Sequence, residues 1–251
     1  SEDTFLVGYV VFDKKPGFAE VDVVEQAQAY LQSRIDSGEF SLPRGVSYRF
    51  AGSYENQQRA TKTLAMVMPI ALFTIFMLIY FEFKSTTTTL LIFTGVFIAW
   101  SGGFILIWLY GQPWFLDFSL FGVEMRGLFQ VHTINMSVAV WVGFLALFGI
   151  ATDDGVVMGT YLTQTFRQNT PASKAEVRAL VIEAGTRRVR PCLMTTATTI
   201  LALIPVLTST GRGSDILVPM AIPSFGGMLI EVVTMLVVPV LYCAIQERKI
   251  K

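Results

Sequence analysis

The chain has 251 residues, of which 53% are hydrophobic and only 15% are charged. This composition is too apolar for an ordinary soluble domain, so it predicts an integral membrane protein. The 19 basic and 19 acidic residues cancel, so the chain lacks the basic character of nucleic-acid-binding proteins, and no nucleic-acid partner is expected.

Residues 1–58 differ from the rest of the chain. The stretch FLVGYVVFD is rich in β-forming residues, DVVEQAQAYLQSRIDSG has helical periodicity, and VSYRFAG alternates apolar and polar residues. This order predicts a small, partial α+β piece with a β-α-β arrangement. Fewer than 60 residues are marginal as an independent domain, and the start carries no secretory signal. We therefore expect the chain to be the later part of a longer protein.

Five long apolar segments follow in residues 59–251, the predicted transmembrane domain. Each is near or above the ~20 residues that cross the hydrocarbon core of a bilayer as a helix. The predicted fold class is therefore a mainly α membrane protein with a five-helix transmembrane bundle. The expected spans are residues 64–81, 90–110, 137–163, 191–208 and 217–245.

Basic residues in the loops predict the orientation of the bundle. They gather between the third and fourth spans and at the C-terminus, which places both on the cytoplasmic side. Five crossings then put residues 1–58 on the outer side, with the aromatic loop that contains Trp114 and His132. The segment EVRALVIEAGTRRVRP reads as an amphipathic helix, either a connector on the inner membrane surface or a coupling helix that moves with its neighbours.

The third span contains two adjacent acids, Asp153 and Asp154. Each costs roughly 2.5–3.5 kcal/mol at mid-membrane, which flanking apolar residues offset at about 0.3–0.6 kcal/mol apiece. The helix can shelter them, because Ala151, Gly155, Gly159 and Thr163 form a strip of small residues that lets another helix approach closely. A sheltered pair of this kind can load and release one proton. The structural alternative is a fixed salt bridge or a cap at a helix break.

The later spans carry further polar groups. The fourth span has four threonines whose hydroxyls can join a hydrogen-bonded relay or bond back to their own helix, and only one that faces the third span would be convincing. Glu231 in the fifth span is either part of a relay or faces water in a crevice. Methionines in the spans raise a metal question, since thioethers suit Cu(I), with packing as the alternative. The four threonines are Thr195, Thr196, Thr198 and Thr199.

Three stretches together resemble the last helices of resistance-nodulation-division efflux pumps. They are NMSVAVWVGFLALFGIATDDGVVM, RVRPCLMTTATTILALIPVLTSTGRGSD and PMAIPSFGGMLIEVVTMLVVPVLY, and they are most similar to the heavy-metal branch. The resemblance implies the end of the second periplasmic loop plus transmembrane helices eight to twelve, about the last quarter of such a pump. It implies a homotrimeric, proton-driven antiporter of the bacterial inner membrane that works with a periplasmic adaptor and an outer-membrane channel.

The resemblance also implies roles for particular residues. By motif position Asp153 matches the relay acid of the tenth helix, Thr195 the relay threonine of the drug pumps, and Arg188 an arginine at the cytoplasmic end of the eleventh helix. Asp154 echoes a DGAVVM run in the fourth helix of metal pumps, as an internally duplicated transporter would show. Glu231 and Thr199 are further relay candidates.

Two departures from the family pattern bear on the substrate. Cys192 stands where some metal pumps have a lysine, and Ser224 stands where copper and silver pumps have a methionine, which leaves Met228 as the one candidate metal ligand. No resident cofactor is expected, and a metal ion enters only as possible substrate. We expect a heavy-metal exporter rather than an enzyme. The alternatives are an exporter of drugs or hydrophobic compounds, or a non-transporting subunit that needs a separately encoded N-terminal half.

Overall fold

The computed structural model describes residues 7–12, 20–43, 45–169, 171–211 and 213–249. The chain divides into two compact units, Ser1–Lys62 and Thr63–Lys251. The first contains helix α1, Glu20–Asp36, which is the helix of the expected β-α-β piece. Arg34 at its end forms an ion pair with Glu39, and its Gln32 side chain accepts a hydrogen bond of 3.3 Å from the Tyr48 hydroxyl.

The two strands expected on either side of α1 are not formed in the described residues. Residues 7–12 and 46–50 have no strand pairing, and the other residues of the first expected strand lie outside the described part. The rings of Phe12 and Phe50 meet edge to face, with centroids 6.3 Å apart. Side chains thus bring the two segments together, but a strand also requires a ladder of backbone hydrogen bonds. An alternating sequence does not by itself supply the second backbone segment with which such a ladder forms.

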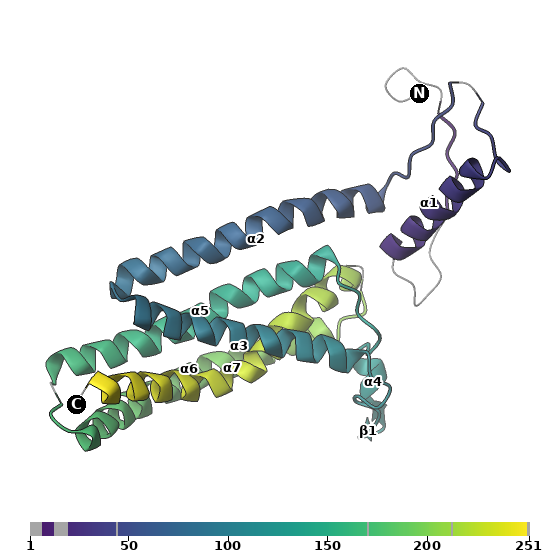
Figure 1. The fold of residues 1–251 in the computed structure, drawn as a ribbon. Coiled ribbons are helices and arrows are strands. Elements are labelled where there is room, and N and C mark those ends of the chain that lie inside the picture. Colours follow the sequence, from purple (N-terminus) through teal and green to yellow (C-terminus); the bar gives the residue numbers. More distant parts are fainter. Residues whose placement is uncertain (1–6, 13–19, 44, 170, 212, 250–251) are drawn as a thin grey trace. The chain divides into compact units, whose positions relative to one another are not determined.

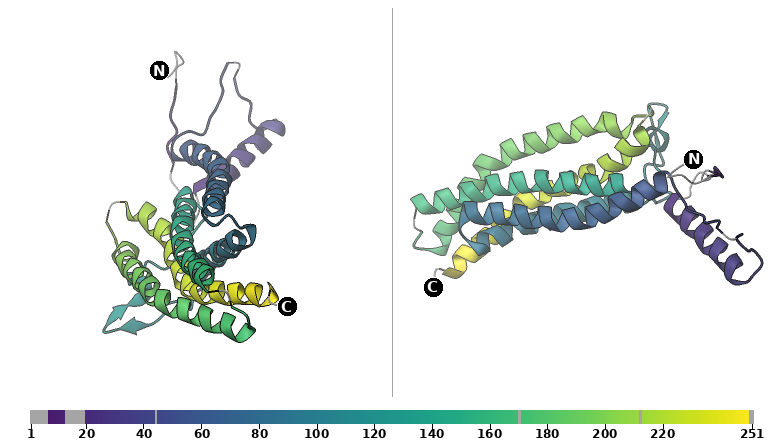
Figure 2. Two further views of the ribbon diagram at one scale, coloured as in Figure 1. Left: turned by 90° about the vertical axis from the view of Figure 1, so that its left-hand side faces the viewer. Right: turned by 90° about the horizontal axis from the view of Figure 1, so that it is seen from above.

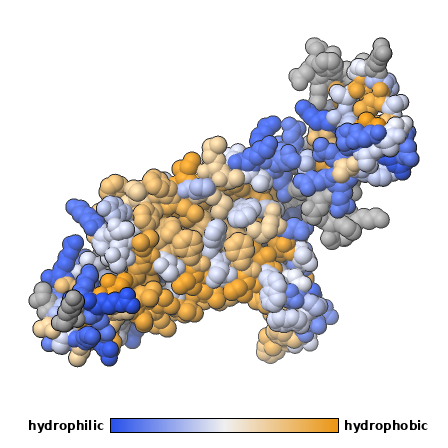
Figure 3. All heavy atoms as spheres, in the orientation of Figure 1, coloured by the Kyte–Doolittle hydropathy of each residue, from blue (hydrophilic) through white to orange (hydrophobic). Residues whose placement is uncertain are grey.

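The predicted set of five membrane-crossing helices is confirmed by length and composition. The helices are α2 (Ser53–Phe83), α3 (Thr86–Tyr110), α5 (Val138–Gln168), α6 (Lys174–Leu207) and α7 (Ser214–Lys249) (Figure 1). In the second unit, apolar surface covers the middle of these helices, and hydrophilic residues gather where α6 begins and α7 ends (Figure 3). This distribution is that of a multi-pass membrane protein.

Helix α6 begins well before the expected start of its span at residue 191. The Ser173 hydroxyl accepts a hydrogen bond from the Glu176 amide at 3.3 Å, and the Glu176 carboxylate accepts one from the Ala172 amide at 2.8 Å. This reciprocal pair is close to a capping box and starts the helix there. Pro191 lies inside α6, as prolines are tolerated in membrane helices. The amphipathic connector and the fourth span are therefore one continuous helix.

Helix α7 is the centre of the bundle, because α3, α5 and α6 all pack against it (Figure 2). Glycines allow the closest approaches. A Cβ placed on Gly226 would lie 2.6 Å from the carbonyl oxygen of Gly102 in α3, and one placed on Gly143 in α5 would collide with the carbonyl of Met220. The Ser224 hydroxyl donates a hydrogen bond of 3.0 Å to the Gly143 carbonyl. The SFGGM motif therefore sets how α7 crosses α3 and α5.

The loop between α3 and α5 has its own structure. A short antiparallel hairpin pairs β1 (Ser119–Leu120) with β2 (Val123–Glu124), and α4 (Met125–Leu128) follows directly. Arg126 donates hydrogen bonds to the carbonyls of Gln112 at 3.2 Å and Pro113 at 2.6 Å, which closes the loop on itself.

Candidate functional site

The acid pair lies in α5, and its two members face different surroundings. Asp154 is half-buried and accepts a hydrogen bond of 3.2 Å on Oδ2 from the Thr196 hydroxyl of α6. Asp153 is exposed. Successive residues of a helix point about 100° apart, so only one of two adjacent side chains can point at α6. In this structure that side chain is Asp154.

The small-residue strip fixes this rotation of α5. A Cβ on Gly155 would come within 2.9 Å of Ile92 Cγ2, and one on Gly159 within 2.7 Å of Ile92 Cδ1. Ile92 is fully buried in α3. The predicted close approach along the strip is therefore present, and the helix that approaches is α3. With that face held, Asp154 turns toward α6.

Thr196 is the single threonine of the four that bonds to α5. It is 4% exposed, and its hydroxyl lies 3.2 Å from Asp154 Oδ2 and 3.0 Å from the Cys192 carbonyl oxygen. One hydroxyl proton serves only one acceptor at a time, so the two acceptors compete. The Thr195 hydroxyl donates to the Pro191 carbonyl at 3.2 Å and that of Thr199 to the Thr195 carbonyl at 2.8 Å. Both of those bonds stay within α6.

Arg188, Cys192 and Thr196 are spaced four residues apart and therefore share one face of α6. The Arg188 guanidinium stacks over the Tyr161 ring of α5, 4.6 Å from its centroid. The Cys192 side chain lies beside the Asp154 carboxylate and within reach of the Arg188 charge. Cys192 thus adjoins the acid site, with Arg188 one turn beyond it in α6. Among the described residues, neither aspartate forms a salt bridge.

Glu231 of α7 is the third acid of the membrane region. It is 1% exposed, and neither carboxylate oxygen has a hydrogen-bond partner among the described residues. Of the two surroundings left open by the sequence, a water-filled crevice does not fit this burial. The charges of Asp154 and Asp153 both act on Glu231, so it belongs to the same electrostatic site.

Met228 is also buried in α7, at 1% exposed. In the described part of the chain, no group of three or more His, Cys, Asp or Glu side chains is arranged to hold a metal ion. The role of Met228 as a metal ligand stays a prediction.

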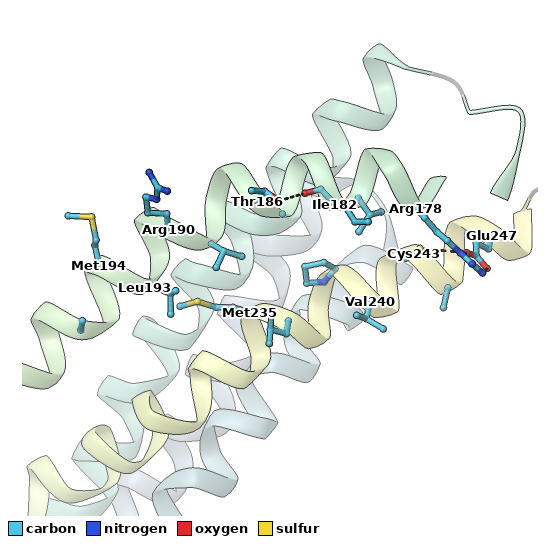
Figure 4. A pocket seen from close by; sticks show the side chains of 17 residues that line it. Arg178, Ile182, Thr186, Arg190, Leu193, Met194, Met235, Val240, Cys243 and Glu247 are labelled. Atoms are coloured by element: carbon cyan, nitrogen blue, oxygen red, sulfur yellow. Dashed lines mark hydrogen bonds and ion pairs between the residues drawn. The ribbon is translucent and has the colours of Figure 1, made fainter. Parts of the chain in front are cut away.

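A groove between α6 and α7 offers different chemistry. Its volume is about 1050 Å³, and Leu193 of α6 and Met235 of α7 are among the side chains that line it (Figure 4). The Arg178–Glu247 ion pair, with a nitrogen–oxygen distance of 2.6 Å, lies at one end. Most of its lining side chains are apolar, and neither Asp154 nor Glu231 is among them. The groove suits apolar contacts, whereas the acid site suits a proton.

Sequence reasoning did not single out two members of the site. Thr196 was one of four equivalent hydroxyls, and Cys192 was read only as a departure from a family pattern. The signal that could have found both is the four-residue spacing along Arg188, Cys192 and Thr196, which puts the three on one face. Together Thr196, Cys192 and Asp154 make a carboxylate with a hydroxyl donor and a thiol beside it, an arrangement that can bind and release a proton.

Known proteins resemble this chain along most of its length. Residues 17–246 match the model of the AcrB/AcrD/AcrF family. The cobalt-zinc-cadmium resistance protein CzcA of Cupriavidus metallidurans is 31% identical over 220 residues, which cover 87% of this chain and 18% of that protein. The cation efflux system protein CusA of Escherichia coli is 31% identical over 229 residues, which cover 88% and 19%.

A solved structure, described as the X-ray crystal structure of a heavy metal efflux pump, crystal form I, is also similar. Its TM-score is 0.59 at 28% identity, over 89% of this chain and 19% of that one. The chain therefore spans about a fifth of the length of these relatives.

Proposed function

We propose that this chain, which belongs to the AcrB/AcrD/AcrF family, forms a membrane part of a proton-driven exporter of heavy-metal cations. The resemblance to the heavy-metal branch of resistance-nodulation-division pumps, predicted from the RVRP, STG and GGM motifs, is confirmed by the family match and by relatives named for cation efflux and metal resistance. The metal is the substrate of the transporter.

The observation that carries the proposal is the hydrogen bond between Asp154 and Thr196 across α5 and α6. An ionised Asp154 accepts this bond, and a charge-assisted bond is stronger than a neutral one. A protonated Asp154 holds Thr196 more weakly, and the hydroxyl then turns to the Cys192 carbonyl, its second acceptor at 3.0 Å. Proton binding therefore loosens one contact between α5 and α6. Such a contact can couple proton movement to a change in helix packing.

The proposed setting follows the family. The transporter is a homotrimer of the bacterial inner membrane and works with a periplasmic adaptor and an outer-membrane channel. Residues 1–58 lie on the periplasmic side, and the basic C-terminal end of α7, with Arg248 and Lys249, lies in the cytoplasm. The carboxylate at position 153 supports a metal exporter over the drug pumps, which carry a lysine there.

The test replaces Asp153 and Asp154 by asparagine, singly and together, in the assembled transporter reconstituted in vesicles. Asparagine keeps the size of the side chain and removes its ability to ionise. We expect Asp154→Asn and the double variant to lose proton-coupled export of a panel of divalent and monovalent metal ions, with assembly intact. Asp117→Asn is the matched control, since that aspartate is an exposed residue of the loop after α3. Unchanged proton-coupled export in the double variant would contradict the proposal.

A further inference from the structure

The buried position of Glu231 is energetically unfavourable for an ionised carboxylate. Its side chain is 1% exposed and both of its oxygens lack partners among the described residues. Its own backbone carbonyl accepts a hydrogen bond of 2.7 Å from the Thr234 hydroxyl, which leaves the carboxyl group unsupported. An unpaired buried carboxylate costs far more than a neutral acid, so the group resides here with its proton attached. Even then, its O–H has no acceptor in this arrangement.

The register of α5 against α7 shows which turn of α5 lies beside Glu231. Ser224 bonds to the Gly143 carbonyl, and a Cβ on Gly227 would strike the Leu147 side chain. Four residues further along both helices, Glu231 lies level with Ala151, one turn from Asp154. Beyond it, Met158 and Val238 belong to one buried cluster. The two helices thus run in parallel register, and Glu231 lies beside the turn that carries the acid pair.

The charged and titratable groups around Glu231 come from two helices. Helix α5 contributes Asp153 and Asp154, whose charges act on Glu231. Helix α6 contributes Cys192, which adjoins Asp154, and Arg188, whose charge acts on Cys192. Helix α3 also packs on α7, but its sequence between residues 86 and 109 has no acidic, basic, histidine or cysteine residue. Neither Glu231 nor Asp154 forms a salt bridge among the described residues, so the natural exchange partner of one carboxyl is the other.

We infer that Glu231 is a second proton carrier of the site, which exchanges a proton with Asp154. Glu231 has no hydrogen-bond partner among the described residues, so the step follows a shift that brings the two carboxyls into contact. The O–H bond of the Glu231 carboxyl then breaks and an O–H bond forms on the Asp154 carboxylate, which leaves Glu231 as the carboxylate. The reverse transfer restores the buried neutral acid. One proton moves and no electrons are exchanged. Two carboxyls that share a proton in this way titrate as a pair. The inference rests on the proposed proton-driven function and extends its proton site from α5 and α6 to α7.

The alternative role for Glu231 is a permanently neutral filler of the core. Glu231→Gln separates the two, because glutamine has the shape of the protonated acid but cannot pass its proton on. We expect Glu231→Gln in the assembled transporter to lower proton-coupled metal export by roughly 10²-fold, the lower end of what a positioned proton-transfer group contributes. Glu231→Asp retains a carboxyl and is expected to keep more export than Glu231→Gln. Glu82→Gln is the matched control, since Glu82 is exposed near the end of α2.

Three outcomes decide the inference. Wild-type export in Glu231→Gln would overturn it, and so would an equal loss in Glu231→Asp and Glu231→Gln, which would indicate packing instead of proton transfer. Loss in Glu231→Gln with partial activity in Glu231→Asp supports it, provided that both variants assemble. A protonophore applied to the wild-type vesicles tests the underlying function separately. If wild-type export survives the protonophore, the proton-driven mechanism is refuted. If the protonophore abolishes wild-type export but Glu231→Gln exports at the wild-type level, only the role of Glu231 is refuted.

Discussion

The hydroxyl that serves Asp154 can be identified by comparing two neighbouring threonines. Thr196→Val removes the hydroxyl that lies 3.2 Å from Asp154 Oδ2 and keeps the branched shape of the side chain. Thr195→Val makes the same chemical change one residue away, where the hydroxyl bonds only to the Pro191 carbonyl of its own helix. We expect the first change to impair proton-coupled export and the second to leave it near the wild-type level.

The size of the effect follows from the hydrogen bond that is lost. A bond to a charged group contributes about 1.5–3 kcal/mol in proteins generally, but bonds between membrane helices average about 0.6 kcal/mol and reach about 1.7 kcal/mol. The Thr196 proton is shared with the Cys192 carbonyl at 3.0 Å, which favours the lower range. That range corresponds to a loss of about 3-fold to about 20-fold, because about 1.4 kcal/mol is a factor of ten.

The assay is metal export driven by an imposed proton gradient in vesicles that contain each variant, with protein content and assembly measured alongside. A steeper dependence of export on the gradient in Thr196→Val than in Thr195→Val would agree with a weakened proton site. If Thr195→Val impairs export and Thr196→Val does not, the position implied by the family resemblance is correct and the role assigned to Thr196 from this geometry is refuted.

Two further predictions concern the helix contacts that hold the site. Gly226→Ala places a Cβ 2.6 Å from the backbone carbonyl of Gly102, which cannot rotate away, so we expect a loss of about 1–3 kcal/mol in thermal unfolding in detergent. Gly149→Ala is its control, since nothing lies within 4 Å of the added Cβ, and we expect it to raise the free energy of unfolding by about 0.5–1 kcal/mol. Equal changes in stability in the two variants would contradict the packing argument. Tyr161→Leu removes the ring under the Arg188 guanidinium and should lower the free energy of unfolding by about 0.5–1 kcal/mol. Tyr161→Phe keeps the ring and should lower it less. The same unfolding measurement compares the two variants, and equal losses would show that the stacking contributes nothing.

The membrane spans could be predicted from sequence because hydrophobic length is a local property. A run of about twenty apolar residues has few alternatives to a membrane helix, and all five runs form one. The strip at Gly155 and Gly159 could also be predicted, because small residues spaced four apart lie on the same face of a helix. The helix that packs against the strip could not be predicted from the sequence. Ile92 of α3 is far away in the sequence, and nothing local to α5 indicates it.

The segments expected to be strands beside α1 show no strand pairing in the described residues, and the two remain strand predictions. Alternation of apolar and polar residues shows that a segment suits a sheet, but a ladder depends on a second backbone at the right distance and register. In the described residues, Phe12 and Phe50 supply a ring contact and no backbone pairing. A helix closes its hydrogen bonds within its own segment, and so α1 forms where its neighbours do not.

The choice between Asp153 and Asp154 depends on helix rotation, which the sequence does not set. The family pattern matches Asp153, whereas the packing of Gly155 and Gly159 on Ile92 turns Asp154 toward α6 and leaves Asp153 exposed. Asp153 has no hydrogen-bond or ion-pair partner among the described residues, so its role as the proton carrier has no partner side chain behind it in this structure. The single asparagine variants separate the cases. A greater loss in Asp154→Asn places the exchange at the α5–α6 contact, and a greater loss in Asp153→Asn places it on the exposed face of α5, about 100° round the helix from that contact.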